Sequence, residues 1–225
     1  VTSSGKTEVY KHYIKSLLLE GKSALVLVPE IFLTPQIYDE FKKNFNDSVY
    51  LYHSGLTELQ RYKIWLAAQD EKPKIIIGTR SAIFLPIKNL EAIIFDEEHD
   101  QSYKQQDGFR YDARNIAKII FGGTANIIYS SATPSLSTLQ NAKDNKMHCF
   151  LLKKRIFNSD MPQIKVHPIN KKNLVGGISH ELIDEIKKND EKGNQTLILL
   201  NRRGYAPVFL CNSCGWIAKS NCCET

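Results

Sequence analysis

Short apolar runs rich in β-branched residues recur along the N-terminal part of the chain, separated by longer segments with helical periodicity. The runs lie at residues 24–29 (ALVLVP), 49–52 (VYLY), 74–78 (KIIIG), 91–98 (EAIIFDEE) and 126–133 (NIIYSSAT). Runs with little polar alternation are typical of strands that helices cover on both faces of a parallel sheet. The pattern therefore predicts an α/β fold built from repeated β-α-β units.

Helix boundary signals fall between these runs. Helix starts are predicted at Gly5, at Thr34 with Pro35, at Thr57 with Gln60 three residues later, and at Asp112, and helix ends at Gly21 and at Gly122–Gly123. The first helix, from Gly5 to about Glu20, would begin where a phosphate is readily bound, because the amide groups at a helix N-terminus lack partners.

The pattern changes after residue 152. A polar, proline-containing stretch predicts a linker over residues 153–175, with room for one strand. Beyond it, Ser179 is predicted to cap a helix, and residues 195–201 (QTLILLN) are predicted to form a strand. We therefore predict one domain over residues 1–152 and the start of a second α/β domain over residues 176–225.

Composition is that of a soluble globular protein, with 42% hydrophobic and 24% charged residues. The apolar runs are too short to span a bilayer, so a cytoplasmic protein without a membrane partner is expected. The formal net charge of +6 slightly favours a polyanionic partner such as nucleic acid. Residues 153–173 are locally basic, although solvated basic linkers are common.

Cysteines gather near the C-terminal end. Four of the five are Cys211, Cys214, Cys222 and Cys223, and this clustering favours a metal site over disulfides. Cys211 and Cys214 have the spacing with which two thiolates bind one tetrahedral Zn²⁺, although a redox-active pair has the same spacing. The remaining cysteine, Cys149, is predicted to be a buried structural thiol.

A phosphate-binding loop is indicated at the first residues. Gly5, Lys6 and Thr7 supply the last three positions of the pattern G-x-x-x-x-G-K-[ST], whose first glycine would precede Val1. The chain is therefore expected to be a fragment that begins inside the loop. Lys6 is predicted to bind the β- and γ-phosphates of a nucleotide, Thr7 to bind Mg²⁺, and the amides around Ser4 and Gly5 to complete the cradle.

Acidic residues follow the apolar run at 91–95. Asp96 is a candidate to hold Mg²⁺ opposite Thr7, and Glu97 is a candidate to orient and activate the attacking water. The alternative is a solvated acidic turn, which is frequent after a strand. Residues 130–135 (SSATPS) also follow an apolar run, where small hydroxyl residues could relay the state of a nucleotide, although the same residues make a good helix start.

The segments SGKT, DEEH and SAT, each at a strand end and in this order, resemble the first three motifs of superfamily two helicases and translocases. VLVPEIFLTPQ, GTRSAIFLP, DEEHDQSYKQQDGFRYDAR and NRRGYAPVFLCNSCGWIA resemble more closely the PriA family of primosomal replication-restart helicases, over almost the whole chain. The resemblance implies a RecA-like parallel sheet as helicase lobe one over residues 1–152, and the start of a second RecA-like lobe with an incomplete zinc-binding insertion.

The family resemblance also implies an activity. It implies an ATP-dependent 3′ to 5′ DNA helicase that uses ATP, Mg²⁺ and Zn²⁺, binds forked DNA with single-stranded arms, and acts with primosome proteins and single-strand-binding protein. The isolated chain is expected to bind nucleotide weakly and to hydrolyse it poorly. Two alternatives stay open: another superfamily two translocase, and a non-catalytic DNA-binding scaffold of the primosome, although a scaffold has no need for Lys6, Asp96 and Glu97 together.

Aromatic and basic residues alternate just after the acidic motif, a pattern that suits single-stranded nucleic acid because rings stack on bases and cations contact phosphates. In related helicases an aromatic-rich loop at this place couples DNA binding to ATP hydrolysis. Together with a hydroxyl and a guanidinium after the run at 74–78, the candidate DNA contacts are Thr79, Arg80, Tyr103, Lys104, Phe109 and Arg110. The alternatives are a core-facing aromatic cluster and a structural role for Arg80.

By the same resemblance, His99 links the nucleotide site to the DNA side. The predicted zinc ligands are Cys211, Cys214 and Cys223. The family has a further cysteine where this chain has Ser220, with Cys222 nearby, so the zinc site is expected to be incomplete or altered.

Overall fold

The computed structural model describes residues 4–29, 35–156, 163–166, 174–175, 178–199 and 214. The chain divides into two compact units, Val1–Met161 and Pro162–Thr225. Their boundary lies inside the stretch predicted as a linker, and the predicted domain bounds themselves stay a prediction.

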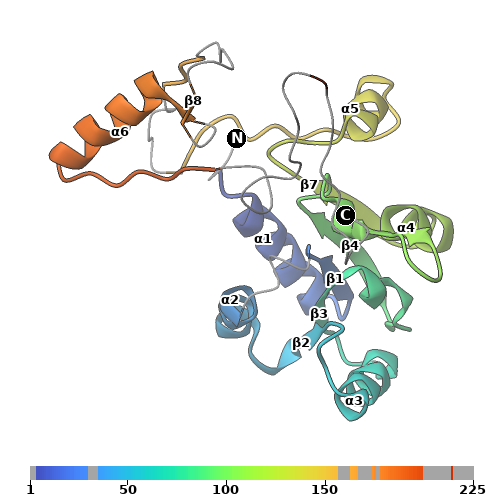
Figure 1. Ribbon diagram of the computed structural model, residues 1–225. Helices are drawn as coiled ribbons and strands as arrows, with labels where there is room; N and C mark the ends of the chain where they lie inside the picture. The colour runs from blue at the N-terminus through green and yellow to red at the C-terminus, as the bar shows by residue number, and fades with distance from the viewer. Residues whose placement is uncertain are drawn as a thin grey trace. The chain divides into compact units, whose positions relative to one another are not determined.

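A five-stranded parallel sheet forms the centre of the first unit (Figure 1). Its strands are β1 (Ser23–Leu27), β2 (Val49–Tyr52), β3 (Ile75–Gly78), β4 (Leu90–Asp96) and β7 (Asn126–Ser130). Their order is β2-β3-β1-β4-β7, and β1 pairs in parallel with both β3 and β4. Every apolar run predicted as a strand in this part of the chain forms one, which confirms the α/β prediction.

Helices begin close to the predicted capping residues. They are α1 (Lys6–Leu19), α2 (Pro35–Phe45), α3 (Glu58–Gln69), α4 (Ala113–Phe121) and α5 (Leu136–Lys143), with 3-10 turns η2 (Asn46–Ser48), η3 (Arg80–Phe84) and η4 (Gln101–Tyr103). Thr57 and Gln60 form the predicted capping box, and Asp112 caps α4 by accepting from the Arg114 amide. Gly21 follows α1 with a φ of 75°, the left-handed conformation that glycine tolerates best. Thr34, the predicted cap of α2, lies outside the described residues.

Each face of the sheet is covered by its own apolar cluster. Alternate residues of β1 point to opposite faces, so Ala24 and Val26 pack with α1 and α2, whereas Leu25 and Leu27 pack with α3 and α4. Figure 1 shows these two pairs of helices on opposite sides of the sheet. With both faces covered, the carboxyl ends of the strands are left to carry functional loops.

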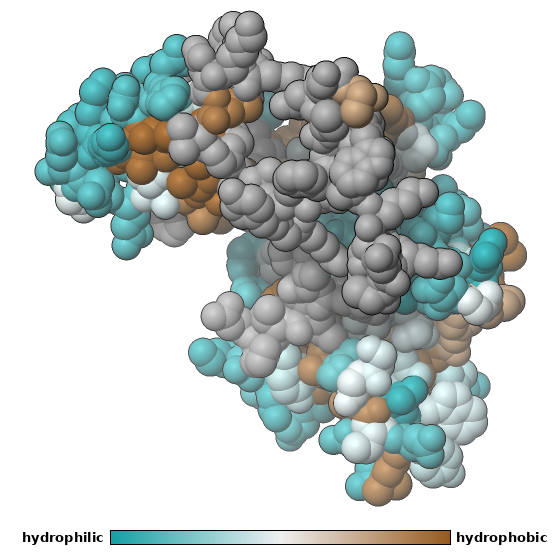
Figure 2. Space-filling model, viewed as in Figure 1, coloured by the Kyte–Doolittle hydropathy of each residue, from teal (hydrophilic) through white to brown (hydrophobic). Residues whose placement is uncertain are grey.

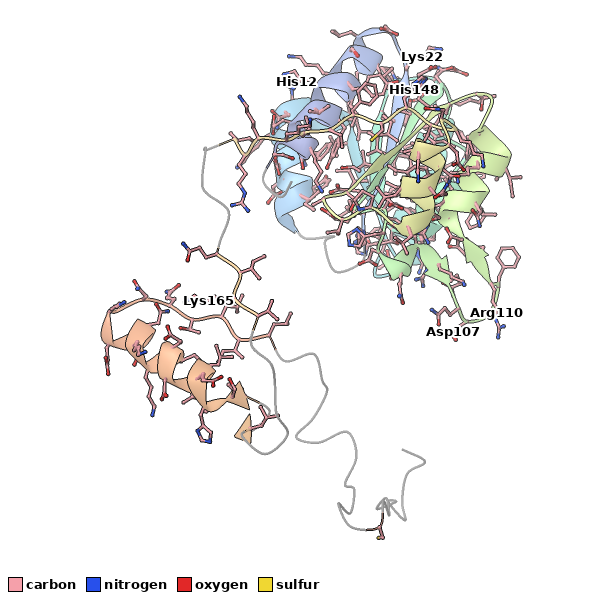
Figure 3. All side chains as sticks on the ribbon, turned by 90° about the horizontal axis from the view of Figure 1, so that it is seen from above. His12, Lys22, Asp107, Arg110, His148 and Lys165 are labelled. Carbon is pink, nitrogen blue, oxygen red and sulfur yellow. The ribbon has the colours of Figure 1, made fainter. Side chains whose placement is uncertain are left out.

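A small antiparallel hairpin lies between β4 and α4. Its strands are β5 (Lys104–Gln105) and β6 (Tyr111–Asp112), and Gly108 in the turn has a φ of 63°. Asp107 and Arg110 lie at its tip and point away from the rest of the first unit (Figure 3).

The second unit has a short hairpin and one helix in its described part. β8 (Leu174–Val175) pairs antiparallel with β9 (Ile178–Ser179), and Ser179 caps α6 (His180–Glu191) as predicted. Figure 2 shows apolar side chains gathered beside hydrophilic ones at α6, where Leu182 is exposed. The described part does not form a second RecA-like lobe, which stays a prediction.

Two local predictions are wrong. Residues 195–199, the described part of the strand predicted at 195–201, have no regular structure, and Leu197 is 98% exposed. An apolar run forms a strand only where another strand pairs with it, and no described strand lies beside this one. Cys149 is predicted to be buried but is exposed, because the residues around it, after α5, have no regular structure and are open to solvent.

Candidate nucleotide and nucleic-acid site

The phosphate loop of the sequence forms the start of α1. Gly5 is the residue before the helix and has a φ of 84°, a left-handed conformation that few other residues adopt. No side chain caps this helix end, so the first amides of α1 are available to an anion. The Ser4 hydroxyl is buried and has no hydrogen-bond partner among the described residues. These features suit a bound phosphate group.

The basic and acidic candidates meet at the carboxyl edge of the sheet. Lys6 Nζ donates to Glu97 Oε1 at 2.7 Å, which joins the start of α1 to the end of β4. Tyr10 donates to Asp96 Oδ2 at 3.3 Å. Lys6, Asp96 and Glu97 therefore lie together, as their motifs predict, and Thr7 follows Lys6 in the first turn of α1.

The Asp96 carboxyl is the electrostatically unusual group of this site. Burial raises its pKa, and the neighbouring Glu97 charge raises it further, against the opposing effects of Lys6 and the Ser130 hydroxyl. A half-buried carboxylate held under such repulsion gains from a nearby cation. With the Thr7 hydroxyl, it could provide two oxygen ligands of the kind that Mg²⁺ prefers.

The third motif lies beside the acidic loop. The Ser131 hydroxyl donates to Glu97 Oε2 at 3.4 Å, and it lies 2.8 Å from His99 Nδ1. His99 Nδ1 also lies 3.6 Å from Glu97 Oε2. His99 and Ser131 thus both contact the carboxylate that also binds Lys6.

Sequence reasoning missed two residues of this site. Tyr10 contacts Asp96 from inside α1, and Glu98 is only 1% exposed, with its carboxylate bound to Ser135. A tyrosine in an amphipathic helix and a third acidic residue in a row carry no local signal of these contacts, because the partners lie 86 and 37 residues away.

The predicted stacking of Tyr103 on a DNA base is wrong in this structure. Tyr103 is 1% exposed, and its hydroxyl donates to the carbonyls of Leu27 at 2.7 Å and Asp96 at 2.5 Å. Its ring packs edge-on against Phe95. Tyr103 is therefore a core residue that joins the ends of β1 and β4, in line with the core-facing alternative.

The residues after β3 are also turned inward. Thr79 is 3% exposed, so its predicted contact with a DNA phosphate is wrong here: the hydroxyl follows a buried strand into the core. Arg80 donates to the carbonyl of Ser102 at 2.8 Å, which supports its structural role. A phosphate contact by Arg80 stays a prediction.

The hairpin carries the exposed candidates. Lys104, Phe109 and Arg110 are exposed, and Phe109 has 74% of its surface open to solvent. At the base of the hairpin, the ring centroid of Tyr111 lies 5.8 Å from that of Phe109 and 5.0 Å from that of Phe84 in η3. The hairpin thus presents one aromatic and two cationic side chains on a base held by aromatic packing.

The zinc prediction is not tested by the described residues. Cys211, Cys223 and Ser220 lie outside them, and Cys214 is exposed. In the described part of the chain, no cluster of three or more His, Cys, Asp or Glu side chains could hold a metal ion. Nor is any helix there long and apolar enough to cross a lipid bilayer.

Comparisons with known proteins agree with this geometry. The family model described as DEAD/DEAH box helicase matches residues 1–142. The replication restart protein PriA of Haemophilus influenzae is 49% identical over 100% of this chain and 31% of its own length. Its Bacillus subtilis counterpart is 37% identical over 100% of this chain and 28% of its own. The chain thus spans about a third of the length of the curated relatives it matches.

Among solved structures, the helicase MrfA bound to DNA and AMPPNP is similar with a TM-score of 0.46. Its sequence identity is 20%, over 63% of this chain and 22% of that one.

Proposed function

This chain belongs to the DEAD/DEAH box helicase family, and from that premise we propose that it forms the ATP-binding lobe of a DNA helicase that acts in replication restart. The observation that carries the proposal is the 2.7 Å contact between Lys6 and Glu97, two residues separated by 91 positions. A basic residue at the start of a helix and a carboxylate at the end of a strand meet there, as hydrolysis of a nucleoside triphosphate requires.

In the proposed reaction, Lys6 exchanges its partner. The Lys6 ammonium leaves Glu97 and binds the β- and γ-phosphate oxygens of ATP, while the first amides of α1 hold the phosphates from the other side. Glu97 is then able to accept a hydrogen bond from the attacking water. Thr7 and Asp96 would hold Mg²⁺, which would supply positive charge to offset that of the phosphates.

Single-stranded DNA is proposed to contact the hairpin. Phe109 is able to stack on a base, and Lys104 and Arg110 are able to contact phosphates, because all three are exposed. The β5–β6 hairpin follows β4 after the acidic loop and η4, so the proposed DNA contact and the carboxylate proposed to position water lie on one continuous segment.

The finer parts of the proposal come from the resemblance of the sequence motifs to the PriA family, given under the sequence analysis. They are 3′ to 5′ movement, preference for forked DNA with single-stranded arms, primosome proteins and single-strand-binding protein as partners, and a zinc ion bound through Cys211, Cys214 and Cys223. By the same proposal, the 225-residue chain alone hydrolyses ATP poorly.

The direct test is ATP hydrolysis by the natural polypeptide that contains these residues, with and without forked DNA. Wild type is expected to be stimulated by the fork. Lys6→Ala is expected to lose at least about 100-fold of that activity, because the phosphates lose the ammonium that is proposed to bind them.

Two results would count against the proposal. Fork binding without stimulated hydrolysis by wild type would favour the scaffold alternative. Unchanged hydrolysis by Lys6→Ala, with or without forked DNA, would show that this site does not take part in the reaction.

A further inference from the structure

Glu97 has an unusual backbone conformation. Its φ is 46°, in the left-handed region, where residues other than glycine are uncommon. Such conformations persist only where the surroundings enforce them, and they cluster at functional sites. Since the side chain leaves the backbone in a direction set by φ, this conformation determines where the Glu97 carboxylate points.

Glu98, the next residue, is held by its side chain. The carboxylate accepts from the backbone amide of Ser135 at 2.7 Å and from the Ser135 hydroxyl at 3.3 Å. Ser135 is the residue that caps α5, through a bond from the Thr138 amide to its hydroxyl. A buried carboxylate at the first residues of a helix is favourably placed, because unpaired amides and the helix dipole face it.

The backbone amide and the backbone carbonyl of Glu98 are hydrogen-bonded as well. Its amide donates to the carbonyl of Ser130 at 3.1 Å, and its carbonyl accepts from Arg114 Nη1 at 2.6 Å. Arg114 is itself fixed by a two-pronged ion pair, with Nε 2.9 Å and Nη2 2.6 Å from the two carboxylate oxygens of Asp112. Amide, carbonyl and side chain of Glu98 are therefore attached to three different elements: β7, α4 and α5.

These contacts leave the backbone after Glu97 little freedom to rotate. The carbonyl of Glu97 is held as well, by the amide of Asp100 at 2.9 Å. None of the hydrogen bonds of Glu98 goes to Lys6, Thr7 or Asp96, so Glu98 has no direct part in the nucleotide site. Its burial and its three attachments nevertheless restrict the backbone of Glu97, the neighbouring residue that does contact Lys6.

We infer that Glu98 is a positioning residue for hydrolysis: its anchoring to Ser135 holds Glu97 in the left-handed conformation that aims the Glu97 carboxylate at Lys6 and the phosphate site. This inference rests on the proposed ATP hydrolysis. Without the anchor, Glu97 relaxes to an ordinary backbone conformation, and its carboxylate moves away from the water it would orient. Nucleotide binding by the α1 amides and Lys6 remains.

The test uses Glu98→Ala and Glu98→Gln in the natural polypeptide. Glu98→Ala is expected to lower kcat by about tenfold or more, with KM for ATP within about twofold of wild type. Glu98→Gln keeps an oxygen that accepts from the Ser135 amide and is expected to retain at least about half of kcat. Wild-type kcat in Glu98→Ala would overturn the inference.

A stability control separates positioning from general damage. Thr57→Ala removes the capping box of α3, which lies on another element and touches no residue of the site. It is expected to lower the melting temperature and to leave kcat unchanged. If Thr57→Ala loses as much kcat as Glu98→Ala, the effect is one of stability and the inference fails.

Two further measurements cover the remaining outcomes. If Glu98→Ala does not fold, Ser135→Ala removes one of the two hydrogen bonds to Glu98, and a kcat of Ser135→Ala equal to that of wild type overturns the inference.

A crystal structure of a folded Glu98→Ala variant measures φ of Glu97 independently of any activity. A φ that stays positive contradicts the inference. If wild type hydrolyses no ATP, the proposed function fails, and the crystal structure still decides whether Glu98 holds the backbone.

Discussion

At the scale of single residues, the contact of Lys6 with Glu97 organises the site. A 2.7 Å ion pair that is partly exposed contributes little to stability, so its place at the start of α1 points to a role in binding rather than in folding. The ion pair also positions the Lys6 ammonium in advance, at the edge of the sheet where the phosphates are proposed to bind.

Gly5→Ala tests the phosphate loop. A side chain here has to adopt the left-handed conformation, at a cost of about 1–2 kcal/mol, and its Cβ would lie 3.1 Å from Ile156 Cδ1. Relief of this strain turns the loop amides, so ATP affinity is expected to fall about 5- to 30-fold. Gly123→Ala, where a Cβ meets no atom within 4 Å, is the control. Equal ATP affinity for the two variants would contradict the account.

Tyr103→Phe tests the assignment of Tyr103 to the core. The change removes one hydroxyl and leaves the carbonyls of Leu27 and Asp96 without that donor, at an expected cost of about 1–3 kcal/mol in the free energy of unfolding. Urea denaturation measures it. Tyr62→Phe, at a side chain that is 56% exposed, is expected to change stability by less than about 0.5 kcal/mol. A larger effect at Tyr62 than at Tyr103 would reverse the assignment.

The position of Tyr103 could not be predicted from its neighbours. Residues 103–111 alternate aromatic and basic side chains, which suits both a nucleic-acid loop and a buried cluster. Burial of Tyr103 depends on the carbonyl of Leu27, 76 residues earlier in the chain, and a local pattern holds no information on such a contact. Lys6, Asp96 and Glu97 were predictable because their motifs follow strand ends, and parallel strands end at one edge.

At the scale of elements, strands were predicted well where neighbours exist and poorly where they do not. β1 and β4 are apolar because both faces are covered, and that pattern is visible in the sequence. Residues 197–199 are also an apolar run, yet none of the described residues at 195–199 pairs with a strand. The composition of a run predicts its tendency to form a strand, whereas its pairing with another strand depends on the rest of the domain.

The cap of α4 gives a prediction on pH. Burial acts to raise the pKa of Asp112, but the hydrogen bonds and charge of Arg114 outweigh it, so the folded-state pKa lies below the ordinary value. A lowered folded-state pKa means that Asp112 contributes stability above its unfolded pKa of about 3.9 and loses it as the pH falls through the folded value.

Asp112→Asn is therefore expected to be less stable than wild type at neutral pH, with a difference that shrinks below about pH 4. Asparagine is as good a helix cap as aspartate, so the comparison isolates the ion pair. Urea unfolding at a series of pH values measures the difference. A gap between the two proteins that stays constant down to about pH 3 would show that the Arg114 pair does not lower this pKa.

At the scale of the whole molecule, the proposed nucleotide site lies at one edge of the sheet and the proposed DNA contact lies on the hairpin between β4 and α4. The sequence predicts both regions, since each has its own motif, and their roles stay proposals. It could not predict that only Lys104, Phe109 and Arg110 of the candidate DNA residues are well exposed, because the same aromatic and basic residue types also build the base of the hairpin.

Phe109→Ala tests the hairpin. Loss of one stacked base is expected to cost about 1–3 kcal/mol, which is about 5- to 150-fold in affinity of the natural polypeptide for a single-stranded oligonucleotide. Fluorescence anisotropy measures this affinity. Phe150→Ala removes an aromatic ring that is 90% exposed elsewhere on the same unit and is expected to leave DNA affinity unchanged. Equal losses for the two variants would mean that the hairpin has no special part in DNA binding.

The central claim is that hydrolysis at the Lys6–Glu97 site drives strand separation, and the most direct measurement is ATP-dependent unwinding of forked DNA by the natural polypeptide and by its Glu97→Gln variant. Glutamine keeps the size of the side chain but not its charge, so ATP affinity is expected to stay within a few-fold of wild type while unwinding is lost. Unwinding by Glu97→Gln at the wild-type rate would contradict the account.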